Sequence, residues 1–133
     1  MLNVLSILLD IKSKEIIRPH LDKVIKEGIW KNIPDSEVEF FLVEHASMFN
    51  KETLLKEVIE SKRTIAFFES THRILKSLEK LNSLGFQKDR KVVICRELTK
   101  RFESIYRGNL EKVINDLKND VTKGEFVVVI KGK

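Results

Sequence analysis

From residue 50 onward, short apolar runs alternate with stretches whose apolar residues recur at helical spacing. The runs are rich in β-branched and aromatic residues, as buried strands are, and the run at 102–106 is the weakest of them. They lie at residues 64–68, 92–95, 102–106 and 126–130. Strands that alternate with helices predict an α/β fold, in which a mixed sheet is covered by helices.

Residue types at the helix ends predict where the helices begin and stop. Asn50 can cap a first helix that runs through Ser61. Thr71 can cap a second helix, and Gly85 ends it because glycine readily adopts the left-handed conformation that follows a helix. A third helix is predicted from i, i+3, i+4, i+7 spacing at Leu110, Val113, Ile114 and Leu117.

Residues 1–50 carry a weaker pattern. Residues 19–27 predict a short helix that stops at Gly28, and residues 38–43 predict a buried strand. The apolar opening at 1–9 has no basic flank and no small-residue cleavage site, so we expect buried structure rather than a signal peptide or a membrane span. We therefore divide the chain into an unassigned amino-terminal region, 1–50, and an α/β domain, 51–133.

Charge is distributed unevenly between these two parts. Residues 1–50 carry six Lys and Arg against eight Asp and Glu, whereas residues 51–133 carry nineteen against twelve. A basic domain attracts polyanions such as RNA, although a lysine-rich soluble surface would give the same balance. The single cysteine, Cys95, lies in an apolar run, which indicates a small core residue in a reducing, cytoplasmic compartment.

The first of three polar loops follows the predicted strand at 64–68. It opens a helix, whose free backbone N–H groups suit a phosphate or a carboxylate. The cations of His72 and Arg73 in the first turn oppose the helix dipole. They indicate either a bound anion or pairing with Glu69, although an exposed first turn tolerates such charges at little cost.

The other two polar loops flank the later strands. The loop at 96–101 places four ionisable side chains around the Thr99 hydroxyl, directly after an apolar strand, where open α/β sheets bind ligands. The segment 123–125 enters the last strand and, taken alone, is an ordinary turn. The histidines at positions 20, 45 and 72 are far apart, so we expect no zinc site.

Four segments of the basic part follow one another in a recognisable order: RTIAFFESTHR at 63–73, CRELTKRFE at 95–103, RGNL at 107–110 and KGEFV at 123–127. They resemble the carboxy-terminal domain of the ribosomal RNA small subunit methyltransferase I family, within the tetrapyrrole methylase superfamily. Members of that family are similar to one another in Glu-Ser-Pro-His-Arg, Arg-Glu-Leu-Thr-Lys and Lys-Gly-Glu stretches at about this spacing. The resemblance covers residues 51–133.

This resemblance implies methyl transfer from S-adenosylmethionine to a ribose 2′-hydroxyl of a cytidine in small-subunit ribosomal RNA. It also implies a dimer. The positions that match the family motifs are Glu69, Ser70, His72, Arg73, Arg96, Glu97, Thr99, Lys100, Gly124 and Glu125.

Within this set, the basic residues are expected to face RNA phosphate or the cleft between two lobes, because guanidinium and ammonium groups suit that role. They are Arg73, Arg96 and Lys100, together with the neighbouring Arg101. Glu69 and Glu97 are expected to orient these cations rather than to act as catalytic bases. Gly124 and Glu125 are weak candidates for contact with the methyl donor, and no catalytic residue is assigned.

The chain also departs from the family pattern. Thr71 stands where the family has proline, and Cys95 stands where alanine is usual. The Thr-Pro-Ile-Gly-Asn, Gly-Thr-Pro and Asp-Pro-Gly segments of the family's amino-terminal lobe, which supplies much of the donor pocket, do not occur in this sequence. Two interpretations follow: part of a methyltransferase that needs the missing lobe as a partner, or a non-catalytic RNA-binding or dimerisation module.

Overall fold

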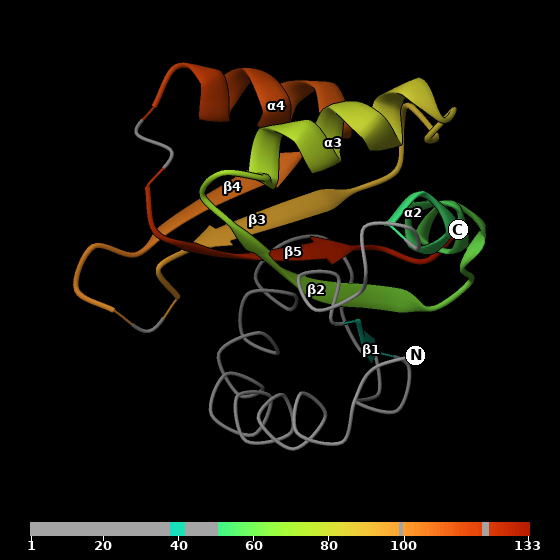
Figure 1. The fold of residues 1–133 in the computed structure, drawn as a ribbon, viewed down its shortest axis with the longest axis horizontal. Coiled ribbons are helices and arrows are strands. Elements are labelled where there is room, and N and C mark those ends of the chain that lie inside the picture. The colour runs from blue at the N-terminus through green and yellow to red at the C-terminus, as the bar shows by residue number, and fades with distance from the viewer. Residues whose placement is uncertain (1–37, 42–50, 99, 121–122) are drawn as a thin grey trace.

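A single mixed sheet organises the computed structural model. The structure describes residues 51–98, 100–120 and 123–133, without the side chains of Lys51 and Leu54. It also describes the backbone of residues 38–41. The strand order of the sheet is β1-β2-β5-β3-β4, with β1 parallel to β2 and the other neighbours antiparallel (Figure 1). The strands are β1 (Val38–Phe41), β2 (Thr64–Ser70), β3 (Val92–Arg96), β4 (Ser104–Gly108) and β5 (Glu125–Ile130).

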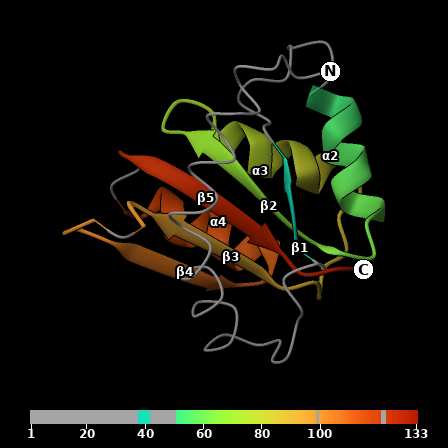
Figure 2. The same cartoon turned by 90° about the horizontal axis from the view of Figure 1, so that it is seen from below.

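The described helices pack on one face of this sheet. They are α2 (Lys51–Glu60), α3 (Ile74–Ser83) and α4 (Leu110–Lys118). Figure 2 shows α3 and α4 lying side by side behind the strands, with α2 on the side of the sheet where β1 and β2 lie. The predicted α/β class, a mixed sheet covered by helices, is therefore confirmed. None of the helices in the described ranges is long and apolar enough to span a membrane.

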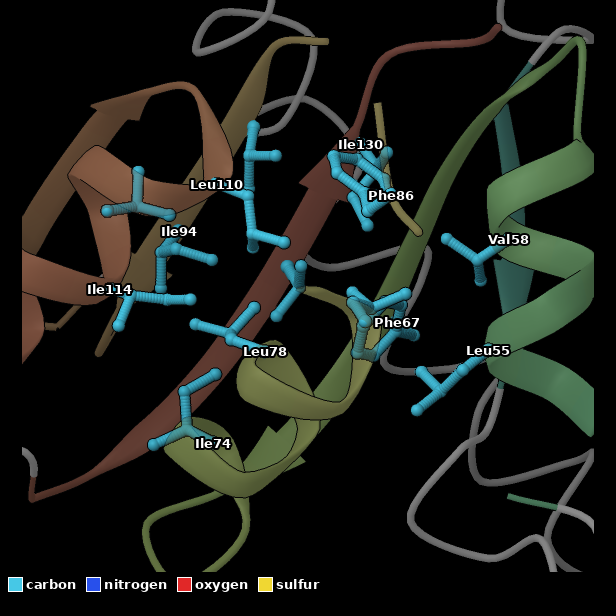
Figure 3. Close-up of a cluster of buried hydrophobic side chains, with 14 of the residues drawn as sticks. Leu55, Val58, Phe67, Ile74, Leu78, Phe86, Ile94, Leu110, Ile114 and Ile130 are labelled. Atoms are coloured by element: carbon cyan, nitrogen blue, oxygen red, sulfur yellow. The ribbon is translucent and has the colours of Figure 1, made fainter. Parts of the chain in front are cut away.

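Alternation along the strands divides the apolar side chains between the two faces of the sheet. In β2, Ile65 and Phe67 join the core beneath the helices, whereas Ala66 and Phe68 belong to a second cluster on the other face. Figure 3 shows the first core, in which side chains from the strands meet those of all three helices. Its helical members include Leu55, Val58, Leu78, Leu110 and Ile114.

Several predicted boundaries differ from the observed ones. Gly85 follows the end of α3 with φ +91°, as predicted, and the four apolar residues predicted for the third helix are buried in α4. The weak strand predicted at 102–106 is wrong by two residues, because β4 begins at Ser104 and Phe102 is exposed in a turn. Three predictions lie outside the described residues: those for residues 1–37, the Asn50 cap, and the end of the strand predicted at 38–43.

Cys95 lies in β3, between β5 and β4, and is fully buried, as the sequence predicted. Burial raises the pKa of its thiol to about 12. Because the thiolate is the reactive form, we expect Cys95 to resist alkylation by iodoacetamide at neutral pH in the native chain and to react in denaturant. Thiol titration with and without denaturant measures this difference, and rapid labelling of the native chain would contradict it.

Candidate functional site

The three polar loops meet at one end of the sheet. Ser70, the last residue of β2, pairs with Glu125, and Arg96, the last residue of β3, pairs with Phe126. The end of β2, the end of β3 and the start of β5 are therefore adjacent, at the left of the sheet in Figure 1. We call residues 69–73, 96–103 and 123–125 together the three-loop end. It contains every described residue that the family motifs singled out.

The first loop is built around a buried carboxylate. Glu69 is 2% exposed, and it accepts hydrogen bonds from Ser77 Oγ at 2.5 Å, Ser70 N at 3.0 Å and Arg73 Nε at 3.3 Å. The cation at the start of α3 is thus paired with Glu69, which is one of the two explanations that the sequence left open. His72, by contrast, is exposed.

Thr71 connects the first loop to the third. Its Oγ1 donates to Gly124 O at 2.7 Å and accepts from Gly124 N at 2.9 Å. The prediction that Thr71 caps α3 is wrong: the helix begins at Ile74 with Arg73 at the cap position and no side-chain cap bond. The hydroxyl is engaged by a residue 53 positions away, which local sequence could not reveal.

The second and third loops are joined by backbone and charged contacts. Glu97 N donates to Glu125 O at 2.8 Å, and Lys100 Nζ lies 3.1 Å from Glu97 Oε2 and 3.3 Å from Glu125 Oε2. The hydrogen bond between Lys100 and Glu97 lowers the pKa of Glu97 and raises that of Lys100. Gly124 has φ +119°, and a Cβ there would lie 2.8 Å from the Glu97 side chain, so the junction requires glycine.

Arg96 ties the base of the second loop to both neighbouring segments. Its Nη1 donates to Lys123 O and its Nη2 to Ser104 Oγ, each at 3.2 Å. Its Nε is buried and has no hydrogen-bond partner among the described residues. Arg101 is exposed at the loop tip, and Thr99 lies outside the described residues.

Two carboxylates of the three-loop end are engaged by neighbouring cations. Glu69 accepts from Arg73 and Glu97 is paired with Lys100, so each carboxylate contacts a cation of the three-loop end. That they orient these cations for RNA rather than act as catalytic bases stays a prediction. In the ranges that the structure describes, no group of His, Cys, Asp and Glu could hold a metal ion. The roles of the residues of the three-loop end toward RNA or a methyl donor remain predictions.

Sequence reasoning missed two partners at this end. Ser77 is a buried hydroxyl on the inward face of α3, and Ser104 is the first residue of β4. A lone serine among the apolar positions of an amphipathic helix is a usable signal, because buried hydroxyls nearly always have a hydrogen-bond partner. The pairing of Ser104 with Arg96 depends on strand register and leaves no comparable trace in the sequence.

The described residues of the three-loop end do not fit S-adenosylmethionine by themselves. The N–H and the carbonyl of Gly124 both bond to Thr71, and the Glu125 carboxylate is paired with Lys100. The two weak donor-contact candidates are thus occupied by contacts between loops. The Arg96 Nε has no hydrogen-bond partner within the described part of the chain, but it is buried, and one donor does not make a nucleoside site.

Comparison with known proteins agrees with the motifs. The family model for tetrapyrrole (corrin/porphyrin) methylases matches residues 16–114, and so includes part of the region that the motifs left unassigned. A ribosomal RNA small subunit methyltransferase I from Buchnera aphidicola is 42% identical over 81 residues, covering 59% of this chain and 28% of the relative. One from Halalkalibacterium halodurans is 30% identical over 114 residues, covering 86% of this chain and 39% of the relative.

The fold agrees as well. A solved cobalt precorrin-4 methyltransferase, an enzyme of cobalamin biosynthesis, superposes with a TM-score of 0.58 at 22% identity, covering 83% of this chain and 46% of that one. The chain therefore spans less than half the length of each of these matched proteins. The family match covers most of the chain, and the chain belongs to the tetrapyrrole (corrin/porphyrin) methylase family.

Proposed function

We propose that this chain is the carboxy-terminal part of an S-adenosylmethionine-dependent methyltransferase that acts on a ribose 2′-hydroxyl of small-subunit ribosomal RNA in the cytoplasm. The observation that carries the proposal is the meeting of three family motifs at one end of the sheet, in a chain 42% identical over 81 residues to a ribosomal RNA methyltransferase. The bound donor would supply an activated sulfonium methyl group.

In this proposal the three-loop end contributes cations and not a general base. Arg101 is exposed, and Arg73 and Arg96 are partly exposed. Glu69 and Glu97 hold Arg73 and Lys100 in place. Because a carboxylate is a weak base for a sugar hydroxyl, rate acceleration would come from positioning the RNA next to the methyl group.

The proposal assigns most of the donor pocket to an amino-terminal lobe of the family type. Support comes from two features of this chain: the lobe's glycine motifs do not occur in its sequence, and Gly124 and Glu125 are already engaged. We therefore expect S-adenosylmethionine to bind the chain only when such a lobe is supplied.

The experiment that tests this proposal combines the chain with the part of the Halalkalibacterium relative that the match leaves uncovered. Transfer of a radiolabelled methyl group to unmodified small-subunit ribosomal RNA is measured for the chain, for that lobe and for the mixture. We expect transfer only in the mixture. Calorimetric titration of S-adenosylmethionine into the same three samples reports donor binding separately.

The outcomes of this experiment separate the two interpretations. Retention of the RNA by the chain, with no methyl transfer in the mixture, would support a non-catalytic RNA-binding module and overturn the enzymatic proposal. Methyl transfer by the chain alone would overturn the assignment of the donor pocket to another lobe. The double variant Arg96→Gln, Arg101→Gln of the chain tests the role given to these cations. Undiminished methyl transfer in the mixture with this variant would contradict that role.

A further inference from the structure

The second loop of the three-loop end exposes an aromatic side chain. Phe102 is 72% exposed, and among the described residues it is the large hydrophobic side chain that faces solvent. The Arg101 guanidinium lies over its ring, 5.4 Å from the centroid. An exposed apolar residue is unremarkable by itself, so the argument depends on how this one is held and on what surrounds it.

Phe102 occupies the tip of a turn. Lys100 N donates to Glu97 O at 2.9 Å and Glu103 N donates to Lys100 O at 3.2 Å, which makes Arg101 and Phe102 the central residues of the second of two consecutive turns. Central turn positions favour Gly, Asn, Asp, Pro and Ser. The turn does not require an Arg-Phe pair at its tip, and Phe102 belongs to neither apolar cluster of the sheet.

The base of the same loop is fixed. Arg96 bonds to Ser104 across the hairpin, and Lys100 lies between the carboxylates of Glu97 and Glu125. Figures 1 and 2 both show the turn, drawn in orange, projecting past the end of the sheet. A fixed base presents the Phe102 ring in a defined place, which lowers the entropic cost of binding a partner.

We propose that Phe102 stacks on an unpaired base of RNA while Arg101 contacts the adjacent phosphate. Aromatic side chains on basic loops hold single-stranded RNA in this way, because every base has a stacking face and arginine adds charge and cation–π attraction. The inference rests on the proposed function and adds the contact by which the RNA is held. Residues 51–133 supply the complementary charge, with nineteen basic against twelve acidic residues.

RNA fits this tip better than a protein surface does. Protein interfaces are centred on contiguous apolar patches in which several side chains are buried together. Here one ring is flanked by Arg101 and Glu103, both exposed, and no other large exposed apolar side chain is found in the described part of the chain. A single ring among charged groups matches a base stacked beside its phosphate.

The test uses the chain as it is and a short single-stranded RNA that contains 2-aminopurine, whose fluorescence falls when it stacks. We expect Phe102→Ala and Phe102→Leu each to weaken binding about tenfold and to abolish the quenching, without changing the dependence of affinity on salt. Leucine keeps an apolar side chain but has no aromatic face. Phe102→Trp should retain both affinity and quenching.

The phosphate contact has its own readout. A plot of log affinity against log salt has a negative slope. Arg101→Gln should make this slope less steep by about 0.7, the value for one phosphate contact to a single strand. Lys88→Gln is the matched control, because Lys88 is exposed in the turn before β3, at the opposite end of that strand. That variant should leave the slope unchanged.

Each failure has a distinct meaning. If the wild-type chain binds no RNA at low salt, the RNA claim of the proposed function fails, and this inference fails with it. If the wild-type chain binds RNA and the alanine and leucine variants match its affinity and quenching, only the stacking inference is overturned. If Phe102→Ala instead changes self-association in sedimentation and leaves RNA binding intact, the residue is a protein contact, which also overturns the inference.

Discussion

Replacing Arg90 with methionine is expected to lower the free energy of unfolding by about 3–5 kcal/mol, because it removes a charged group that donates to carbonyls at the end of α2 and after β5 at the same time. Arg90 is 6% exposed. It donates through Nη1 to Ile59 O at 2.7 Å, through Nη2 to Val58 O at 3.0 Å, and through Nε to Lys131 O at 2.5 Å. One side chain thus caps the end of α2 and ties it to the segment after β5.

Methionine matches the aliphatic length of arginine, so the variant isolates the loss of the donors from the loss of packing. The free energy of unfolding of Arg90→Lys should lie between those of the wild type and Arg90→Met, because an ammonium group cannot reach three separate carbonyls from one nitrogen. The control is Lys88→Met, an exposed residue two positions away, with a change within about 0.5 kcal/mol. Unfolding in urea measures all three, and a loss below about 1 kcal/mol for Arg90→Met would show that water replaces the guanidinium.

The elements of the fold could be predicted because their signals are local. In α4, the spacing of Leu110, Val113, Ile114 and Leu117 places all four on the buried face. In β2 and β5, continuous apolar runs mark strands that are covered on both faces, and the clusters on the two sides confirm this. The sequence could not show that β5 enters the sheet between β2 and β3, because strand order depends on contacts between distant segments.

The sequence likewise predicted many residues of the candidate site, but not the partners to which they bond. The motifs identified Glu69, Arg73, Arg96 and Lys100, and the structure places them at one end of the sheet. Their partners were less accessible. Arg90 never stood out, because the backbone carbonyls to which it donates lie 29 to 41 positions away in the sequence. Such partners have no local signal, because any buried carbonyl can accept the bond.

Replacing Glu69 is the second change with a large expected effect. Glu69→Ala should lower the free energy of unfolding by about 2–5 kcal/mol, because it leaves the Ser77 hydroxyl and the Ser70 N–H without their acceptor in a buried place. Glu69→Gln should cost less, about 1–3 kcal/mol, since one oxygen remains to accept but the amide nitrogen faces other donors. Glu97→Gln is the control, because that carboxylate lies at the surface and its ion pair contributes little.

A double-mutant cycle between Glu69→Gln and Ser77→Ala tests whether the two side chains act together. Because Ser77 Oγ donates to Glu69 Oε2 at 2.5 Å, we expect the two losses to be non-additive by about 0.5–3 kcal/mol in urea unfolding. Additive losses would show that the carboxylate is held by Ser70 N and Arg73 alone. RNA affinity measured on the same variants adds the functional comparison. Glu69 is buried at the end of β2 and Arg101 is exposed at the tip of the second loop, so Glu69→Gln should reduce stability far more than RNA binding, whereas Arg101→Gln should do the reverse.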